Sequence, residues 1–211
     1  MNLTQIRTRV RSLTGIRSAS LLSDAEIDEA VNEFNYNLLG AYEWPQLVGV
    51  QTLNTTALSD GVAFPSSASQ IVGVETDIAG LGRRTHLRGI SLTEFNMLTS
   101  TVSGKPEMYV ADAMLRTVKF WPRPDAEYPA VVHFKRRVSR MAADSDIPVL
   151  EEEFHLMWAQ AAASSLLKSR AGDGSRINNL DVRVNASIAR ARKMYLMNPD
   201  RMALPLPDRW S

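Results

Sequence analysis

Side chains that could carry out acid–base or metal chemistry are sparse in this sequence. The three histidines, His86, His133 and His155, lie in three separate predicted elements, and none has a second histidine four residues away. Glu152 and His155 have the spacing of half a di-iron motif, which needs two such pairs and two further carboxylates on facing helices. Since the second pair is missing, we expect these two to be exposed helix residues, and we expect no metal or other cofactor.

Motifs for nucleophilic catalysis and phosphate binding are also missing. The chain has no cysteine, which excludes disulfides, thiolate metal sites and thiolate catalysis. Gly80-Leu81-Gly82 lacks the third glycine of a dinucleotide site, and there is neither a P-loop nor a Gly-x-Ser-x-Gly sequence. Acidic clusters could supply a glycosidase pair, but positions at helix N-termini explain them more simply. A Ser/His/Asp site assembled only in space stays open; otherwise we expect no catalytic residues and no enzyme.

The bulk composition is that of one medium globular domain, or one domain with an inserted lobe. The chain has 211 residues, of which 22% are charged, and its formal net charge is only +1. Such a near-neutral total favours neither nucleic acid nor a membrane as a dedicated partner. The N-terminus lacks the apolar run of a signal peptide, and no stretch is long and apolar enough to span a bilayer. The lack of cysteine fits a reducing cytoplasm.

Two amphipathic helices are predicted in the first 45 residues. Apolar residues recur at spacings of three and four from Leu3 to Leu13, and Gly15 ends the stripe. Ser23 and Glu26 have the spacing of a capping box that opens a second helix. Proline disfavours helical backbone in the residue before it, so we expect this helix to end just ahead of Trp44-Pro45.

Two further helices are predicted after residue 140. Pro148 marks the start of the first, and we expect Glu151–Glu153 in its first turn, where they complement the helix dipole. Its apolar face is rich in alanine and serine, which lets a partner backbone approach closely. The last helix carries apolar residues at helical spacing from Ile177 to Tyr195, with several cations near its C-terminal end.

Between the helical segments the sequence has the patterns of short strands and turns. Three strands are predicted at Leu47–Leu53, Gln70–Glu75 and Arg83–Arg88, and a β-meander with strands at Met108–Ala111, Leu115–Trp121 and Ala130–Val138. The predicted fold class is therefore α+β. Residues 1–45 and 141–197 form a helical bundle, residues 46–140 form an inserted antiparallel β-rich lobe with one short helix, and residues 198–211 form an extended arm.

The C-terminal arm combines prolines with apolar anchors. Three prolines in the nine residues 199–207 favour an extended backbone. The anchors are Met202, Leu204, Leu206 and Trp210. We expect them to dock onto a neighbouring copy or another partner, because an extended backbone with apolar anchors suits groove binding. The alternative is an arm folded back onto its own core.

Charge is grouped along the chain although its sum is near zero. Residues 1–20 hold four arginines and no acid, whereas residues 21–44 hold six acids and no base. Solvated helix faces that match the helix dipoles are the simpler explanation of this grouping. The alternative is complementary faces on copies of one subunit. The candidates for a subunit interface are Glu151, Glu152, Glu153, Trp158, Lys135, Arg136 and Arg137. Contact of Lys135–Arg137 with DNA phosphates is the second interpretation of that cluster.

The order and spacing of several motifs together are typical of one family. They are Leu22–Ile27 and Tyr42–Pro45 in the first helical pair, Gly104–Pro106 with Tyr109, Trp121–Asp125 in the β-rich insertion, and Asp146–His155 followed by Arg170–Asp173 around the alanine-rich helix. In this arrangement, over residues 20–197, the chain resembles the head-to-tail adaptor (connector) proteins of tailed bacteriophages.

The resemblance implies a structural protein of the virion neck, assembled in the host cytoplasm. Such adaptors form a ring, usually dodecameric, that docks below the portal protein, extends the DNA channel and presents a platform to the next neck or tail protein. Double-stranded DNA would pass transiently and without sequence specificity, and Arg7, Arg9 and Arg11 are the candidates for positions near the channel. The alternatives are a tail-completion or terminator ring, a monomeric DNA-binding module, and a cell-wall hydrolase.

Overall fold

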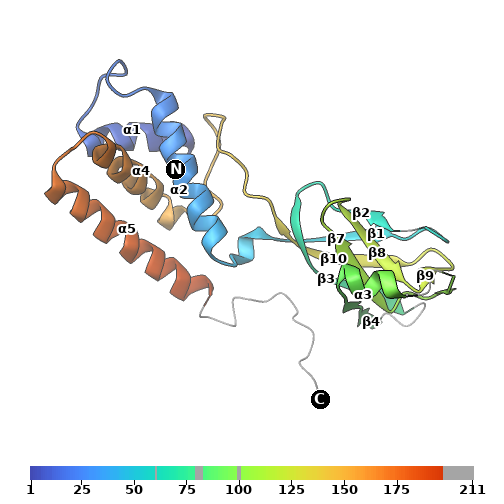
Figure 1. Ribbon diagram of the computed structural model, residues 1–211. Helices are drawn as coiled ribbons and strands as arrows, with labels where there is room; N and C mark the ends of the chain where they lie inside the picture. Colours follow the sequence, from blue (N-terminus) through green and yellow to red (C-terminus); the bar gives the residue numbers. More distant parts are fainter. Residues whose placement is uncertain (60, 79–82, 99–100, 197–211) are drawn as a thin grey trace. The chain divides into compact units, whose positions relative to one another are not determined.

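The protein divides into two compact units, seen in a computed structural model that describes residues 1–59, 61–78, 83–98 and 101–196 (Figure 1). Met1–Gln46 and the chain from Val138 onward form a helical unit, and Leu47–Arg137 forms a β-rich unit. The fold class is α+β, as the sequence predicts. The expected arm, with Met202, Leu204, Leu206 and Trp210, lies outside the described residues.

The first two helices have the boundaries that the sequence predicts. α1 (Leu3–Thr14) ends at Gly15, whose φ of 76° is a left-handed conformation that glycine adopts without strain. α2 (Asp24–Ala41) begins with the expected capping box. The Ser23 hydroxyl accepts a hydrogen bond from the Glu26 backbone N–H, and the Glu26 carboxylate accepts one from the Ser23 backbone N–H.

The first helix after the β-rich unit starts later than the sequence indicates. α4 (Leu156–Ser169) follows a short 3₁₀ helix, η2 (Glu152–Phe154), so the prediction that Glu151–Glu153 occupy the first turn of the long helix is wrong. The chain makes a tight turn there, in which the His155 Nε2 donates to the Leu150 carbonyl over 2.7 Å. α5 (Gly174–Tyr195) follows and begins at Asp173, whose carboxylate accepts from the Ser175 N–H.

α4 is the centre of the helical unit, because it packs against α1, α2 and α5 (Figure 1). Its fully buried Ala159, Ala162 and Ala163 carry almost no side-chain bulk, which lets the neighbouring helices approach. The indole of Trp158 is fully buried, lies edge-to-face with Phe34 at 5.7 Å, and donates to the Asn35 Oδ1 over 3.1 Å. Burial of its aromatic ring and pairing of its N–H together fix α4 against α2.

Two buried asparagines on α2 fasten the chain where it returns from the β-rich unit. The Asn32 side chain accepts from the Met141 N–H over 2.8 Å and donates to the Met141 carbonyl over 2.9 Å. The Asn35 amide donates to the Ser139 carbonyl over 3.2 Å. Since Asn32 and Met141 are both buried, the Asn32 bonds satisfy backbone groups that water does not reach.

The β-rich unit contains two four-stranded sheets. The first has the strand order β1-β10-β3-β4 and the second β2-β8-β7-β5. The strands are β1 (Val48–Asn54), β2 (Val62–Ala63), β3 (Ala68–Ile78), β4 (Arg83–His86), β5 (Arg88–Gly89), β7 (Met108–Asp112), β8 (Thr117–Trp121) and β10 (Pro129–Arg136). The remaining elements are η1 (Pro45–Leu47), α3 (Leu92–Met97) and the two-stranded pair β6 (Ser103–Gly104) and β9 (Arg123–Pro124).

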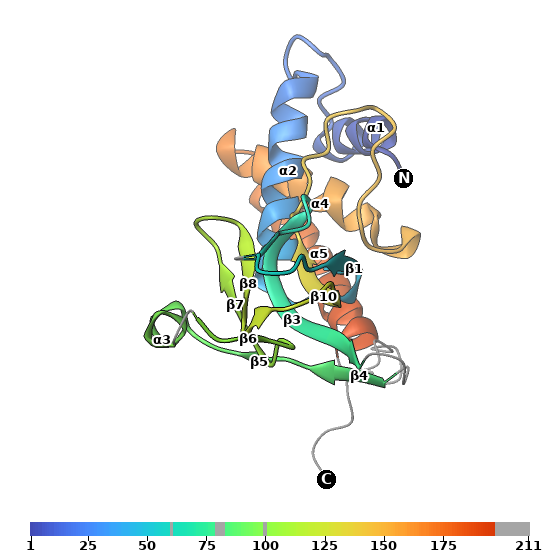
Figure 2. The same ribbon diagram turned by 90° about the vertical axis from the view of Figure 1, so that its right-hand side faces the viewer.

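The predicted meander is wrong in its last strand. β7 and β8 pair antiparallel, but β10 leaves them and lies between β1 and β3 (Figure 2). The connection from Pro122 to Tyr128 is too long for a tight hairpin, and its prolines have no N–H to extend the β7–β8 ladder. β10 is buried along most of its length, which is typical of a central strand. In the first sheet it pairs with β1 on one side and β3 on the other.

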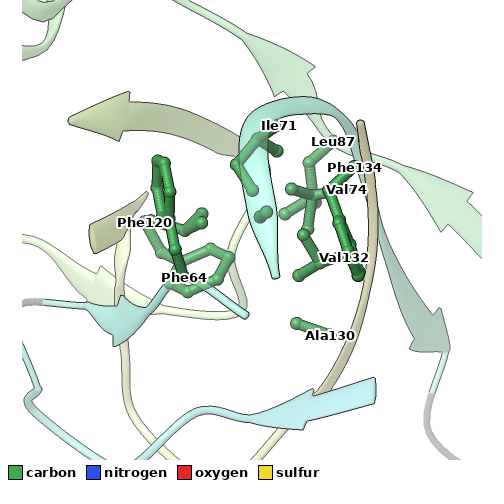
Figure 3. Close-up of a cluster of buried hydrophobic side chains, with 10 residues drawn as sticks. Phe64, Ile71, Val74, Leu87, Phe120, Ala130, Val132 and Phe134 are labelled. Carbon is green, nitrogen blue, oxygen red and sulfur yellow. The ribbon is translucent and has the colours of Figure 1, made fainter. Parts of the chain in front are cut away.

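One apolar core joins the two sheets. Val74, Val132 and Phe134 come from the first sheet, and Phe120 from the second, with Phe64 close beside it in Figure 3. Gly49 in β1 is required by this packing, because a Cβ there would lie 2.6 Å from the Phe134 ring. Successive side chains of β8 point to opposite faces of its sheet. Phe120 therefore lies in the core, whereas its neighbours Lys119 and Trp121 are partly exposed.

We predict that Asn32→Ala destabilises the helical unit by about 2 to 4 kcal/mol, because it leaves the buried Met141 N–H and carbonyl without partners. Asn37→Ala is the matched control: Asn37 lies on the same helix but is exposed. Urea unfolding followed by circular dichroism measures both. Equal stability of the two variants would contradict the role given to Asn32.

Candidate assembly surfaces

The N-terminal arginines mostly fasten α1 to its neighbours. The Arg7 guanidinium donates from Nε and Nη2 to the two oxygens of Asp28, each over 2.7 Å, and from Nη1 to Asp144. These bonds hold the pKa of Arg7 above its ordinary value, mainly through Asp28. Arg11 pairs with Asp24 at 2.8 Å. Arg9 is exposed, so of the three candidates for the DNA channel it is the one whose side chain is turned to solvent.

The acidic cluster before α4 is partly engaged inside the subunit. Glu153 accepts from the Arg190 guanidinium over 2.8 Å, and Glu152 lies 3.7 Å from the Met1 amino group. All three glutamates, Glu151 included, are nevertheless exposed. Trp158, the fourth interface candidate of this region, is fully buried and therefore contributes to the core of its own subunit.

His155 is buried, contrary to the exposed position expected from the sequence. Its Nε2 donates to the Leu150 carbonyl, which leaves Nδ1 as an acceptor, 2.6 Å from the Met1 amino nitrogen. Burial lowers the pKa of His155 below its ordinary value of 6.5. The neutral ring therefore has a structural role in the turn before α4.

The basic cluster at the end of β10 lies at the rim of the first sheet. The Arg137 N–H donates to the Ser67 carbonyl over 2.8 Å and its Nε donates to the Ala68 carbonyl over 3.3 Å. Arg136 is exposed and Lys135 partly so. Within the described part of the chain, Lys135, Arg136 and Arg137 form no ion pair with a carboxylate, so their charge is available to an outside partner.

The structure brings together two histidines that the sequence keeps 47 residues apart. The Nε2 atoms of His86 and His133 each lie 3.2 Å from the Oε1 of Glu75, a carboxylate that is only 6% exposed. The register of β3 with β4 and β10 causes this contact, and no spacing in the sequence indicates it. In the described ranges, no three acidic or imidazole side chains have the geometry to hold a metal ion. The Arg84 guanidinium also lies 3.9 Å from the Glu75 Oε2, so a permanent cation and two imidazoles surround this buried carboxylate.

A hollow of about 750 Å³ lies beside the second sheet. Phe95 and Leu98 from the α3 region line one side, and Thr117, Lys119 and Trp121 of β8 line another. Large apolar side chains nearby in the sequence are strongly exposed: Met97 at 80%, Met114 at 94% and Leu115 at 65%. Leu115 lines this hollow, so at least one of these exposed apolar side chains lies at its edge.

We predict that the free energy of unfolding falls as the pH drops from about 7 to about 5, and that His155→Gln flattens this slope. The unfolded chain binds a proton at His155 near pH 6.5, whereas the folded protein, with its lowered pKa, does so only at lower pH. Urea unfolding at several pH values checks the slope, and NMR titration of the imidazole signals checks the pKa. A His155 pKa of 6.5 or above would contradict the prediction.

Similarity to known proteins identifies the family of this chain. None of the helices in the described ranges is long and apolar enough to cross a membrane. No curated protein matches the chain. The sequence model of the family described as SU10 adaptor protein matches residues 1–202, nearly the whole chain. The chain therefore belongs to the SU10 adaptor protein family, a family of structural head-to-tail adaptors of bacteriophages.

Proposed function

We propose that this chain forms a dodecameric ring below the portal protein, where it extends the DNA channel and provides the platform for tail attachment. The observation that carries this proposal is the family match over residues 1–202. It would make the chain a component of the virion neck, assembled in the host cytoplasm. The absence of a recognisable reaction centre from the described residues is in keeping with a structural role.

The two units suit two different tasks in such a ring. The helical unit has a tightly packed centre at α4 and charged outer faces, which suits repeated contacts between copies. The β-rich unit carries the hollow and the exposed Met97, Met114 and Leu115, which suit contacts with a downstream neck or tail protein. The exposed Glu151–Glu153 and the rim residues Lys135–Arg137 remain candidates for contacts between subunits.

DNA passage requires weak contacts that do not depend on sequence. The net charge of +1 limits the counterion release that would hold DNA tightly. Arg7 and Arg11 already have carboxylate partners, so Arg9 is the candidate that can face the channel. A ring with few free cations along the channel would let the genome slide through.

The proposal is tested by mixing the purified chain with portal rings of the same phage and determining the complex by native mass spectrometry and electron microscopy. We expect twelve copies of the chain in a ring on one side of the portal. A six-fold ring would instead indicate a tail-completion or terminator protein. Tight binding to free DNA in place of the portal would indicate a DNA-binding module.

We predict that removal of residues 199–211 weakens portal attachment at least about tenfold while the subunit stays folded, because the apolar anchors of the arm would be lost. Leu204→Ser/Leu206→Ser/Trp210→Ala in the full-length chain should act in the same way, and Asp208→Asn is the control within the arm. Co-sedimentation with portal rings measures attachment. An insoluble or unfolded truncation would show that the arm belongs to its own core.

A further inference from the structure

Two helices of the helical unit carry opposite charges on surfaces that do not face each other. α2 has five carboxylates and no cation, and α5 has five cations and one carboxylate. α4 lies between them and packs against both. Each helix therefore turns one side toward α4 and the other side outward.

Most of the α2 carboxylates already have partners within the subunit. Asp24 and Asp28 pair with the arginines of α1. Glu26 pairs with Arg170, and Glu29 with Arg140. Glu33 is the one carboxylate of α2 that makes no ion pair with any described residue.

Some cations of α5 also have partners within the subunit, and others have none among the described residues. Arg190 pairs with Glu153, and the guanidinium of Arg192 lies 4.6 Å from the centre of the Tyr42 ring. Arg183 and Lys193 are exposed and form no ion pair in the described ranges. The outer faces thus keep unneutralised charge of opposite sign, negative on α2 and positive on α5.

Exposed small or apolar side chains lie on the same outer faces as these charges, together with polar ones such as Glu29 and Asn37 on α2. On α2, Tyr36 is 43% exposed and follows Glu33 by three residues. Gly40 lies one turn further, and a Cβ placed there would touch nothing within 4 Å. On α5, Val182 is 59% exposed, and Ala186 lies four residues beyond it on the same exposed face. Each face therefore combines one small residue, Gly40 or Ala186, with one exposed apolar side chain that a second helix could cover.

The two charges lie equally far along their helices from the point where the helix ends meet. The contact of Tyr42 with Arg192 brings the ends of α2 and α5 together. Glu33 lies nine residues before Tyr42, and Arg183 lies nine residues before Arg192. At a rise of about 1.5 Å per residue, both charges are roughly 14 Å from that common end.

We infer that the outer face of α2 in one copy packs against the outer face of α5 in the next copy, with Glu33 opposite Arg183. The two faces are complementary yet turned away from each other in one subunit, so only a second copy can pair them. Contacts between two different faces are heterologous, and they close into a ring when the rotation permits. This inference rests on the proposed ring and names the surfaces that build it.

Charge reversal on the portal-bound complex tests the pairing. We expect Glu33→Arg and Arg183→Glu each to lower ring occupancy at least about tenfold, since each places like charges opposite each other. The double variant Glu33→Arg/Arg183→Glu should recover most of the occupancy. Arg17→Glu is the control, because Arg17 is exposed and outside both helices. Circular dichroism and urea unfolding show whether each variant is folded.

Cysteine cross-linking gives a second readout that does not depend on occupancy. Because the chain has no cysteine, Tyr36→Cys and Ala186→Cys introduce single thiols. We expect disulfide-linked dimers when the two variants are mixed, and none from either variant alone.

The outcomes separate the inference from the proposed function. Rings that form equally well from both single charge variants, a double variant that does not recover, or cross-links within one cysteine variant alone would overturn the pairing of α2 with α5. A wild-type chain that forms no ring on the portal would overturn the proposed function itself.

Discussion

The structure depends on closing one helical unit from two segments of chain that are separated by the whole β-rich unit. Residues 47–137 intervene between α2 and the chain that leads to α4. Bringing the two ends of so long a connection together costs conformational entropy. Favourable contacts between the two helical segments must offset this cost. Asn32 and Asn35 meet this requirement with buried side-chain amides that bond to the backbone at Met141 and Ser139 and to the Trp158 indole.

This closure determines which charges remain for assembly. Once α1 and the returning chain are in place, Arg7, Arg11, Arg140 and Arg170 neutralise most carboxylates of α2. Partly buried pairs such as Arg7 with Asp28 stabilise the subunit, whereas exposed pairs contribute little. The charges left over, such as Glu33 and Arg183, are exposed and form no ion pair with any described residue, and the proposed pairing between copies uses these two.

The β-rich unit is organised differently. One apolar core lies between its two sheets, and other apolar side chains are exposed on its surface. Phe64, Phe120 and Phe134 fill that core, while the α3 region and the β7–β8 turn present Met97 and Met114 to solvent. Strand pairing places the buried carboxylate of Glu75 beside two imidazoles and the Arg84 guanidinium, all from neighbouring strands. None of these features forms a reaction centre, and all of them suit a protein that works through its surfaces.

The sequence by itself determined the local features: the capping box at Ser23, the end of α1 at Gly15, the α+β class and the family resemblance. These depend on hydrogen bonds and backbone preferences within a few residues, which sequence patterns record directly. Only the tertiary structure decided that β10 lies between β1 and β3, that His155 is buried, and that Glu75 meets His86 and His133. Strand pairing and burial depend on contacts between residues far apart in the chain, and spacing along the sequence does not encode which of several compatible partners will meet.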